Sequence, residues 1–250
     1  MHTIVLATQK GGSGKSTLAI GLALAAMQAG HTVRLIETDS QGTLSNWQRR
    51  RAGTEPMVES IYAAGNLERR LQSLGESGVT LTIVDTAGGV SAATASAIRH
   101  SDLCLIPTRP SVADIEAAAS TLQAARAWNK PFAIVLNQTP IRGQRMANAA
   151  NTLVGDGALD LTRVLAQPFI AMRNDHQDAL SAGLAVSEYA PQSKSADEVR
   201  SLWQWVEAKL NARAADRPTA DGLPASPGIA PSIFLQAPAD AAPPVSWSGL

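Results

Sequence analysis

The sequence predicts a doubly wound α/β fold, in which a mostly parallel sheet carries helices on both faces. Two observations lead to this prediction. Apolar runs of strand length alternate with longer runs of helical character along residues 1–210, and this order is typical of right-handed βαβ units. In addition, the first apolar run leads directly into a glycine-rich loop and then a helix, an arrangement that binds phosphate groups in such folds.

Six runs have the length of strands, and most are continuously apolar, as buried parallel strands are. They are residues 3–8, 33–36, 57–61, 79–85, 103–107 and 132–137, with a further short strand near 164–165. Helices are expected at 16–29, around Trp47, and at 66–74, 92–100, 112–128, 142–153 and 175–182. A last helix is predicted from the capping-box spacing of Ser195 and Glu198 and from one apolar face, made by Val199, Leu202, Trp203, Val206 and Leu210.

Composition limits the classes of function. The chain has 21 basic and 21 acidic residues and a formal net charge of zero, so binding to nucleic acid or to an anionic membrane would need a local patch. A single cysteine, Cys104, lies in an apolar run and is expected in the core. With one cysteine and four scattered histidines, no metal cluster is expected.

Two domains of different character are expected. Residues 1–210 form the α/β domain, and residues 211–250, rich in Ala, Pro, Gly and Ser, form a disordered tail. The chain shows no signal sequence, and the apolar stretch 18–27 is too short to span a membrane. We therefore expect a cytoplasmic protein without a membrane partner.

The loop Lys10–Thr17 reads K-G-G-S-G-K-S-T. Glycines let consecutive backbone N–H groups point at an anion, and the helix that follows adds the positive end of its dipole. Lys15 is placed to contact the β- and γ-phosphates of a nucleotide, and the Ser16 hydroxyl to contact Mg²⁺. The residues expected to bind the nucleotide here are Gly11, Gly12, Ser13, Gly14, Lys15, Ser16 and Thr17.

This loop carries an additional lysine, Lys10, and resembles the deviant Walker A motif of the ParA/MinD family of P-loop ATPases, in particular the small single-domain ParA-type partition ATPases. The resemblance extends over about residues 2–210. It implies that ATP and Mg²⁺ are the cofactors and that Lys10 reaches the nucleotide of a second subunit. Lys10 and Lys15 are therefore candidate catalytic residues.

Asp85 ends an apolar strand in Ile83–Thr86, at the edge of a parallel sheet where ligands bind. It resembles a Walker B aspartate, which holds Mg²⁺; the alternative is a turn or helix-capping residue. The family usually has prolines after this motif, whereas this chain has Ala87-Gly88-Gly89. The loop is therefore expected to be more mobile than in the family.

The segment Glu37–Gly42 resembles the family sequence D-x-D-P-Q-G. By that resemblance Asp39 orients the attacking water, senses the γ-phosphate and contributes to the metal site, which makes it the main catalytic candidate. The alternative is an acidic turn that caps a helix. Glu37 and Ser40 replace an aspartate and a proline of the family pattern.

Asn137 follows a predicted strand, where the family uses an asparagine amide to read adenine; an ordinary turn residue is the alternative. The family also binds DNA without sequence preference through basic residues of its C-terminal half. Candidate phosphate contacts are Arg173, Lys194 and Arg200, and Arg49–Arg51 form a second possible patch. Each of these residues could instead be plain solvated surface.

The resemblance implies an ATPase that dimerises on ATP, binds nucleoid DNA and moves DNA or another cargo, with a ParB-like partner protein that stimulates hydrolysis. A MinD-like regulator of cell division at the membrane is one alternative. It would need a basic amphipathic helix at the C-terminus, and this tail is interrupted by prolines. A metabolic P-loop enzyme is the other alternative, and it would have no need of Lys10.

Overall fold

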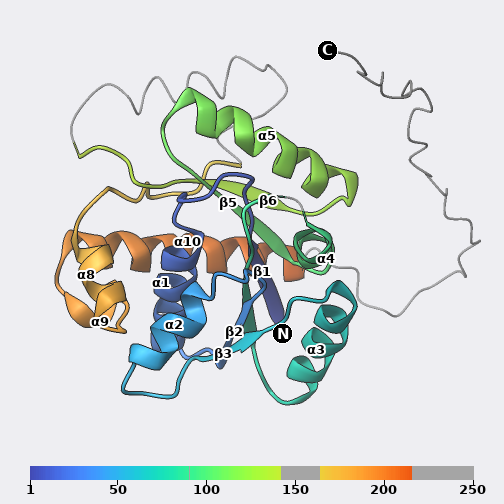
Figure 1. Cartoon of the computed structure of the whole chain (residues 1–250), viewed down its shortest axis with the longest axis horizontal. Coiled ribbons are helices and arrows are strands. Elements are labelled where there is room, and N and C mark those ends of the chain that lie inside the picture. The colour runs from blue at the N-terminus through green and yellow to red at the C-terminus, as the bar shows by residue number, and fades with distance from the viewer. Residues whose placement is uncertain (90, 142–163, 216–250) are drawn as a thin grey trace, which may run out of the picture. The chain divides into compact units, whose positions relative to one another are not determined.

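The computed structural model describes residues 1–89, 91–141 and 164–215 and contains a six-stranded sheet (Figure 1). The strands lie in the order β3-β2-β4-β1-β5-β6, and every pairing is parallel. Their bounds are β1 His2–Leu6, β2 Val33–Glu37, β3 Met57–Ser60, β4 Leu81–Asp85, β5 Leu103–Thr108 and β6 Phe132–Leu136. The predicted doubly wound parallel sheet is confirmed.

Helices cover both faces of the sheet (Figure 1). One layer contains α1 Lys15–Gln28, α2 Thr43–Arg50, α8 Asp175–Ser181, α9 Val186–Tyr189 and α10 Lys194–Ala215, and the other contains α3 Ala64–Glu76, α4 Ala92–Arg99 and α5 Val112–Ala127. Each layer has its own apolar core, because alternate residues of each strand point to opposite faces. Helix α1 is buried along most of its length, between the sheet and α10.

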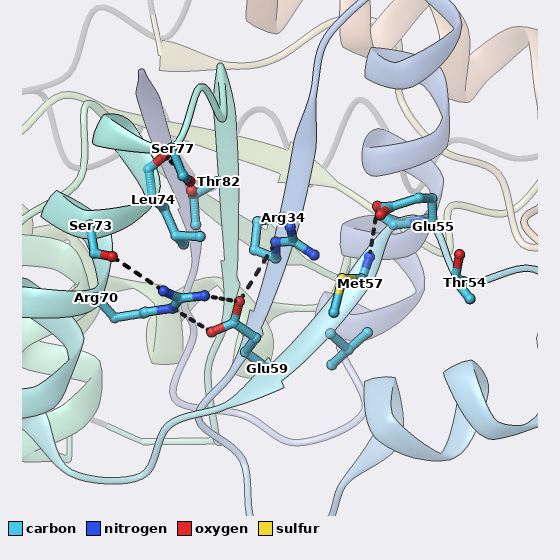
Figure 2. Close-up of polar contacts among 12 residues, drawn as sticks. Arg34, Thr54, Glu55, Met57, Glu59, Arg70, Ser73, Leu74, Ser77 and Thr82 are labelled. Atoms are coloured by element: carbon cyan, nitrogen blue, oxygen red, sulfur yellow. Dashed lines mark hydrogen bonds and ion pairs between the residues drawn. The ribbon is translucent and has the colours of Figure 1, made fainter.

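Strand β3 forms one edge of the sheet and is tied to the layer of α3 by charged side chains (Figure 2). Glu59 on β3 accepts two hydrogen bonds of 2.6 Å from Arg70 on α3. On the neighbouring strand β2, Arg34 Nε lies 3.6 Å from the same carboxylate. One acidic side chain thus links two strands and a helix at this edge.

The start of α10 differs from the prediction. The prediction that Ser195 and Glu198 form a capping box is wrong. The hydroxyl of Ser193 accepts from the N–H of Ala196 and so caps the helix two residues earlier. Ser195 lies inside the helix and donates to Asp175 at 2.9 Å, and Glu198 pairs with Arg173. Both polar side chains serve contacts between elements that sequence spacing does not reveal.

Other differences concern element bounds. The helix predicted at 142–153 lies outside the described residues, and the strand predicted near 164–165 is only an isolated bridge between Leu165 and Ile134. Helix α10 continues to Ala215, beyond the expected boundary at 210, because its last residues contain neither proline nor glycine. The tail predicted beyond it lies outside the part of the chain that the structure describes.

Candidate functional site

The loop between β1 and α1 has the backbone geometry of an anion cradle. Gly12 and Gly14 have φ angles of 74° and 87°, in the left-handed region that favours glycine. Gly14 is the N-cap of α1, so the first turn of that helix opens onto the loop. The Ser13 hydroxyl is buried in the loop and has no hydrogen-bond partner among the described residues. This arrangement suits a phosphate group, which accepts hydrogen bonds from backbone and side chain alike.

Lys15 is held inside this loop. Its side chain is buried, and Nζ lies 3.5 Å from the carbonyl oxygen of Lys10 as a donor. Burial lowers the pKa of Lys15, while the negative charges of Asp85 and Asp39 act in the opposite direction. The lysine predicted from the sequence to contact phosphate therefore lies close to both predicted carboxylates.

Ser16 and Asp85 form the candidate metal site. Ser16 Oγ donates to Asp85 Oδ2 at 2.6 Å, and Asp85 is fully buried at the carboxyl end of β4. Burial raises the pKa of Asp85 to about 7; the Ser16 hydrogen bond and Lys15 oppose this shift, whereas Glu37 and Asp39 add to it.

The donor set at this point fits Mg²⁺. Asp85 Oδ1 is buried and has no hydrogen-bond partner in the described part of the chain, so one oxygen is free for a metal-bound water. Across residues 1–89, 91–141 and 164–215 no group of three or more His, Cys, Asp or Glu side chains could hold a metal. A cation here would take most of its ligands from water and phosphate, as Mg²⁺ does in nucleotide sites.

Asp39 lies in the loop that follows β2. Its Oδ1 accepts from the N–H of Gln41 at 2.9 Å, and its backbone carbonyl accepts from Gly42, which closes a turn. The side chain is half-buried and near enough to Lys15 and Asp85 to affect their pKa values. The structure thus brings Asp39 to the predicted site, although its catalytic and metal-binding roles stay predictions.

Glu37 has a structural role that the sequence did not reveal. Its buried carboxylate accepts from the N–H of Leu44 at 2.6 Å and from both the N–H and the hydroxyl of Ser45. These groups belong to the first turn of α2, whose N-cap residue, Gly42, has no side chain. Glu37 therefore caps α2 from a neighbouring strand, and its extra methylene relative to aspartate lengthens its reach.

The loop Ala87–Gly89 lies directly against the glycine-rich loop. A Cβ atom on Gly88 would lie 3.3 Å from the carbonyl oxygen of Gln9, and the N–H of Gly89 donates to Thr8 at 3.3 Å. The missing side chain of Gly88 permits this close backbone approach, and a proline at position 89 would lack the N–H that donates to Thr8. The expectation of greater mobility is not tested by this arrangement.

Asn137 and Gln138 lie on the other side of the glycine-rich loop. Asn137 Nδ2 donates to the carbonyl of Ser13 at 2.8 Å, and Gln138 Nε2 donates to the carbonyl of Gly12 at 2.9 Å. The predicted adenine contact of Asn137 stays a prediction, because this hydrogen bond uses only Nδ2. Sequence reasoning missed Gln138 altogether, since no recognised motif contains it.

Lys10 is half-buried and lies close enough to Asp114 on α5 to influence it. Burial raises the pKa of Asp114, but hydrogen bonds from Ser111 and Arg109 and the charge of Lys10 outweigh it and hold this pKa below its usual value. Asp114 was missed as a neighbour of the site. The S-x-x-D spacing of Ser111 and Asp114 could have revealed that the two residues cap α5. It could not have revealed that Asp114 lies close to Lys10.

The predicted DNA contacts are not equally available. Arg173 forms a bidentate ion pair with Glu198, at 2.7 and 2.8 Å, and its side chain is only 17% exposed. Arg200 donates to Asp197 and to the carbonyl of Pro191. Lys194 is exposed at the first residue of α10 and is the most accessible of the three.

The triplet Arg49–Arg51 is largely used within the fold. Arg51 pairs with Glu188 at 2.6 and 2.7 Å and lies over the Trp47 ring, while Arg50 donates to the carbonyl of Leu180. The Arg51 side chain is only 10% exposed. The prediction that all three arginines share one basic patch is therefore wrong, because Arg51 joins α2 to α9 instead.

Comparison with known proteins agrees with this geometry. The sequence model of the VirC1 protein family matches residues 1–157, which is more than half of the chain. The chain belongs to the VirC1 family of ParA/MinD-type ATPases with a deviant Walker A motif. The match includes the glycine-rich loop, Asp39, Asp85 and Asn137 of this VirC1-family chain.

Two relatives extend the likeness. The VirC1-family chain is 28% identical over 213 residues to the maintenance of carboxysome distribution protein A of Gloeobacter kilaueensis, an alignment that covers 84% of this chain and 94% of the relative. It is also 33% identical over 127 residues to a ParA protein of Rhizobium radiobacter. That alignment covers 49% of this chain and 55% of the relative. The chain thus spans about half the length of that ParA protein.

Solved structures show the same fold. The McdA–ATP complex from Cyanothece has a TM-score of 0.65 at 16% identity and is matched over 84% of this chain and 96% of its own.

Among the residues that the structure of this VirC1-family chain describes, no helix has the length and apolar character needed to cross a membrane.

Proposed function

We propose that the protein binds Mg²⁺-ATP, associates into a dimer around the bound nucleotide and hydrolyses the ATP to position a large cargo. The observation that carries this proposal is the convergence of Lys15, Asp39 and Asp85 on one glycine-rich loop. Phosphoryl transfer needs charge neutralisation and positioning more than covalent chemistry, and these residues supply both.

Each side chain has a separate task in this proposal. The N–H groups of the loop and the Lys15 ammonium bind the β- and γ-phosphates, and the Ser16 hydroxyl and the Asp85 carboxylate hold Mg²⁺, directly or through water. When bound, Mg²⁺ neutralises charge on the transferred phosphoryl group. Asp39 orients the attacking water, and its position close to Lys15 supports that role.

Dimerisation is proposed to occur across the carboxyl edge of the sheet, with Lys10 of each subunit completing the site of its partner. Three large apolar residues that follow the ends of strands are well exposed, between 56% and 65%: Tyr62 after β3, Val112 after β5 and Ile141 after β6. Apolar groups around a site at this edge suit a surface that is covered by another protein.

The class of cargo is proposed from the relatives. One relative is named for the distribution of carboxysomes and another is a ParA protein, which supports positioning of a large object, either DNA or a protein assembly. A partner protein that stimulates hydrolysis and a nucleoid location belong to the same proposal. DNA would provide the surface to which the ATP-bound dimer attaches, and Lys194 is its best-exposed predicted contact.

Retention on DNA tests this proposal. Asp39→Ala, which slows hydrolysis while leaving Lys10 and Lys15 in place, is expected to remain on non-specific duplex DNA in Mg²⁺-ATP and to elute in Mg²⁺-ADP. A salt series should show the steep loss of affinity that phosphate contacts produce. Equal retention with ATP and ADP would contradict nucleotide-controlled attachment to DNA.

A further inference from the structure

Two adjacent side-chain amides at the end of β6 hold two adjacent carbonyl groups of the glycine-rich loop. Gln138 donates to Gly12 O at 2.9 Å and Asn137 donates to Ser13 O at 2.8 Å. The contact is close: a Cβ atom on Gly14 would lie 2.3 Å from Asn137 Nδ2 and 3.5 Å from Gln138 Nε2. A side chain at position 14 would therefore displace the Asn137 amide, and the φ angle of 87° also favours glycine there.

The backbone that carries the amide pair is fixed on both sides. The N–H of Asn137 donates to the carbonyl of Thr108 on β5 at 3.0 Å, and the N–H of Thr139 donates to the carbonyl of Ile170 at 3.0 Å. Between them Gln138 has a φ of 53°, a left-handed conformation that is uncommon for residues other than glycine. Such strain persists where the surroundings determine the conformation, and it is often linked to function.

The geometry of the peptide unit connects these carbonyls to phosphate binding. In a planar trans peptide the carbonyl of one residue points away from the N–H of the next. A donor on Gly12 O therefore fixes the direction of the Ser13 N–H, and a donor on Ser13 O fixes that of the Gly14 N–H. Hydrogen bonds in such chains also polarise one another, which strengthens each N–H as a donor.

We propose that Gln138, with Asn137, is a positioning residue that keeps the Ser13 and Gly14 N–H groups directed at the nucleotide phosphates. This inference rests on the proposed function in assuming that the loop binds a nucleoside phosphate. It assigns to Gln138 a role outside the motifs recognised in the sequence. It also gives Asn137 a task distinct from recognition of the base.

Two variants separate positioning from plain structural support. Gln138→Glu keeps the shape of the side chain but replaces the donor with an acceptor that faces Gly12 O. Gln138→Gly removes the donor and also relieves the backbone strain at φ 53°. The control is Gln123→Glu, the same change on the exposed face of α5.

The experiment measures the Kd of fluorescent ATP and ADP analogues with Mg²⁺, and the Tm of each nucleotide-free protein. Both Gln138 variants are expected to bind at least fivefold more weakly than wild type, while the Tm of Gln138→Gly stays equal to or above that of wild type. A Kd within twofold of wild type in both variants would overturn the inference. A Tm loss in Gln138→Gly that accounts for the weaker binding would overturn it as well.

The proposed function can fail separately. If wild type and Gln123→Glu do not bind either analogue, the premise of a nucleotide site is wrong. If they bind and the Gln138 variants bind equally well, only the positioning role is wrong.

Discussion

At the scale of single residues, the site combines charges that would repel one another without a ligand. Asp85 is buried close to Glu37 and Asp39, and this burial raises the pKa of Asp85 to about 7. The positive charge of nearby Lys15 opposes this rise in the pKa of Asp85. Bound Mg²⁺ and phosphate would complete the balance of charge, which is the arrangement expected of a site built for a charged ligand.

Glu37 allows a direct test at this scale. In Glu37→Gln one of the two acceptor oxygens becomes an NH₂ donor that faces the N–H groups of Leu44 and Ser45. We expect a loss of about 1–3 kcal/mol in the free energy of unfolding, because buried donors are left without acceptors. Urea unfolding at pH 7 measures this loss, with Glu116→Gln, at an exposed position of α5, as the matched control. A loss no larger than that of the control would show that Glu37 does not cap α2.

Sequence reasoning predicted which residues lie together where a motif fixes their spacing, whereas their roles stay predictions. The positions of Lys15, Ser16 and Asp85 follow from a glycine-rich loop and a strand end whose residue patterns are specific to nucleotide sites, and the structure places Ser16 and Asp85 2.6 Å apart. Glu37 and Gln138 could not be found in this way. Their partners lie in other elements, and such contacts become visible only when the chain is folded.

At the scale of elements, α2 connects the Asp39 loop to α9. Glu37 caps its first turn, and Arg51 directly after its last turn pairs with Glu188. Burial raises the pKa of Glu188, but hydrogen bonds from Arg51 and from the Ala185 N–H and the charge of Arg51 outweigh it and hold this pKa below its usual value. The ion pair therefore stabilises the fold most fully when both partners are charged.

The pH dependence of this pair can be predicted. Because the pKa of Glu188 is lower in the folded state, its stabilisation is present above the unfolded pKa and is lost as the pH falls through the folded value. Glu188→Gln is expected to cost about 1–2 kcal/mol in unfolding free energy at pH 7, and the difference from wild type should shrink below about pH 4.5. Urea unfolding between pH 3.5 and 8 measures it, beside Glu116→Gln. A difference that does not change with pH would contradict the ion pair.

Helices and strands were predicted well where the apolar runs are continuous, as in β1, β4 and β5. The start of α10 was not, because Ser193, Ser195 and Glu198 all have residue types suited to capping. Only tertiary contacts assign Ser195 to Asp175 and Glu198 to Arg173. The four-residue helix α9 is too short to leave a periodic signal in the sequence.

At the scale of the whole molecule, the parallel sheet brings the ends of β1, β2, β4 and β6 to one edge. Asp85 is the last residue of β4, and the glycine-rich loop, Asp39 and Asn137 follow the ends of β1, β2 and β6. The same edge carries the exposed apolar residues Val112 and Ile141. A face that combines the proposed nucleotide site with exposed apolar groups is the one that we propose a second subunit covers.

The central claim is that ATP brings two copies of the chain together and that Lys10 makes this possible. Sedimentation velocity tests it most directly, with Asp39→Ala to slow hydrolysis and Asp39→Ala/Lys10→Ala as the matched variant. Both proteins should bind Mg²⁺-ATP, which titration with a fluorescent analogue verifies. We predict that Asp39→Ala sediments as a dimer in saturating Mg²⁺-ATP and as a monomer in Mg²⁺-ADP, whereas the double variant is monomeric in both. An ATP-saturated protein that stays monomeric, or a double variant that dimerises equally well, would contradict the account.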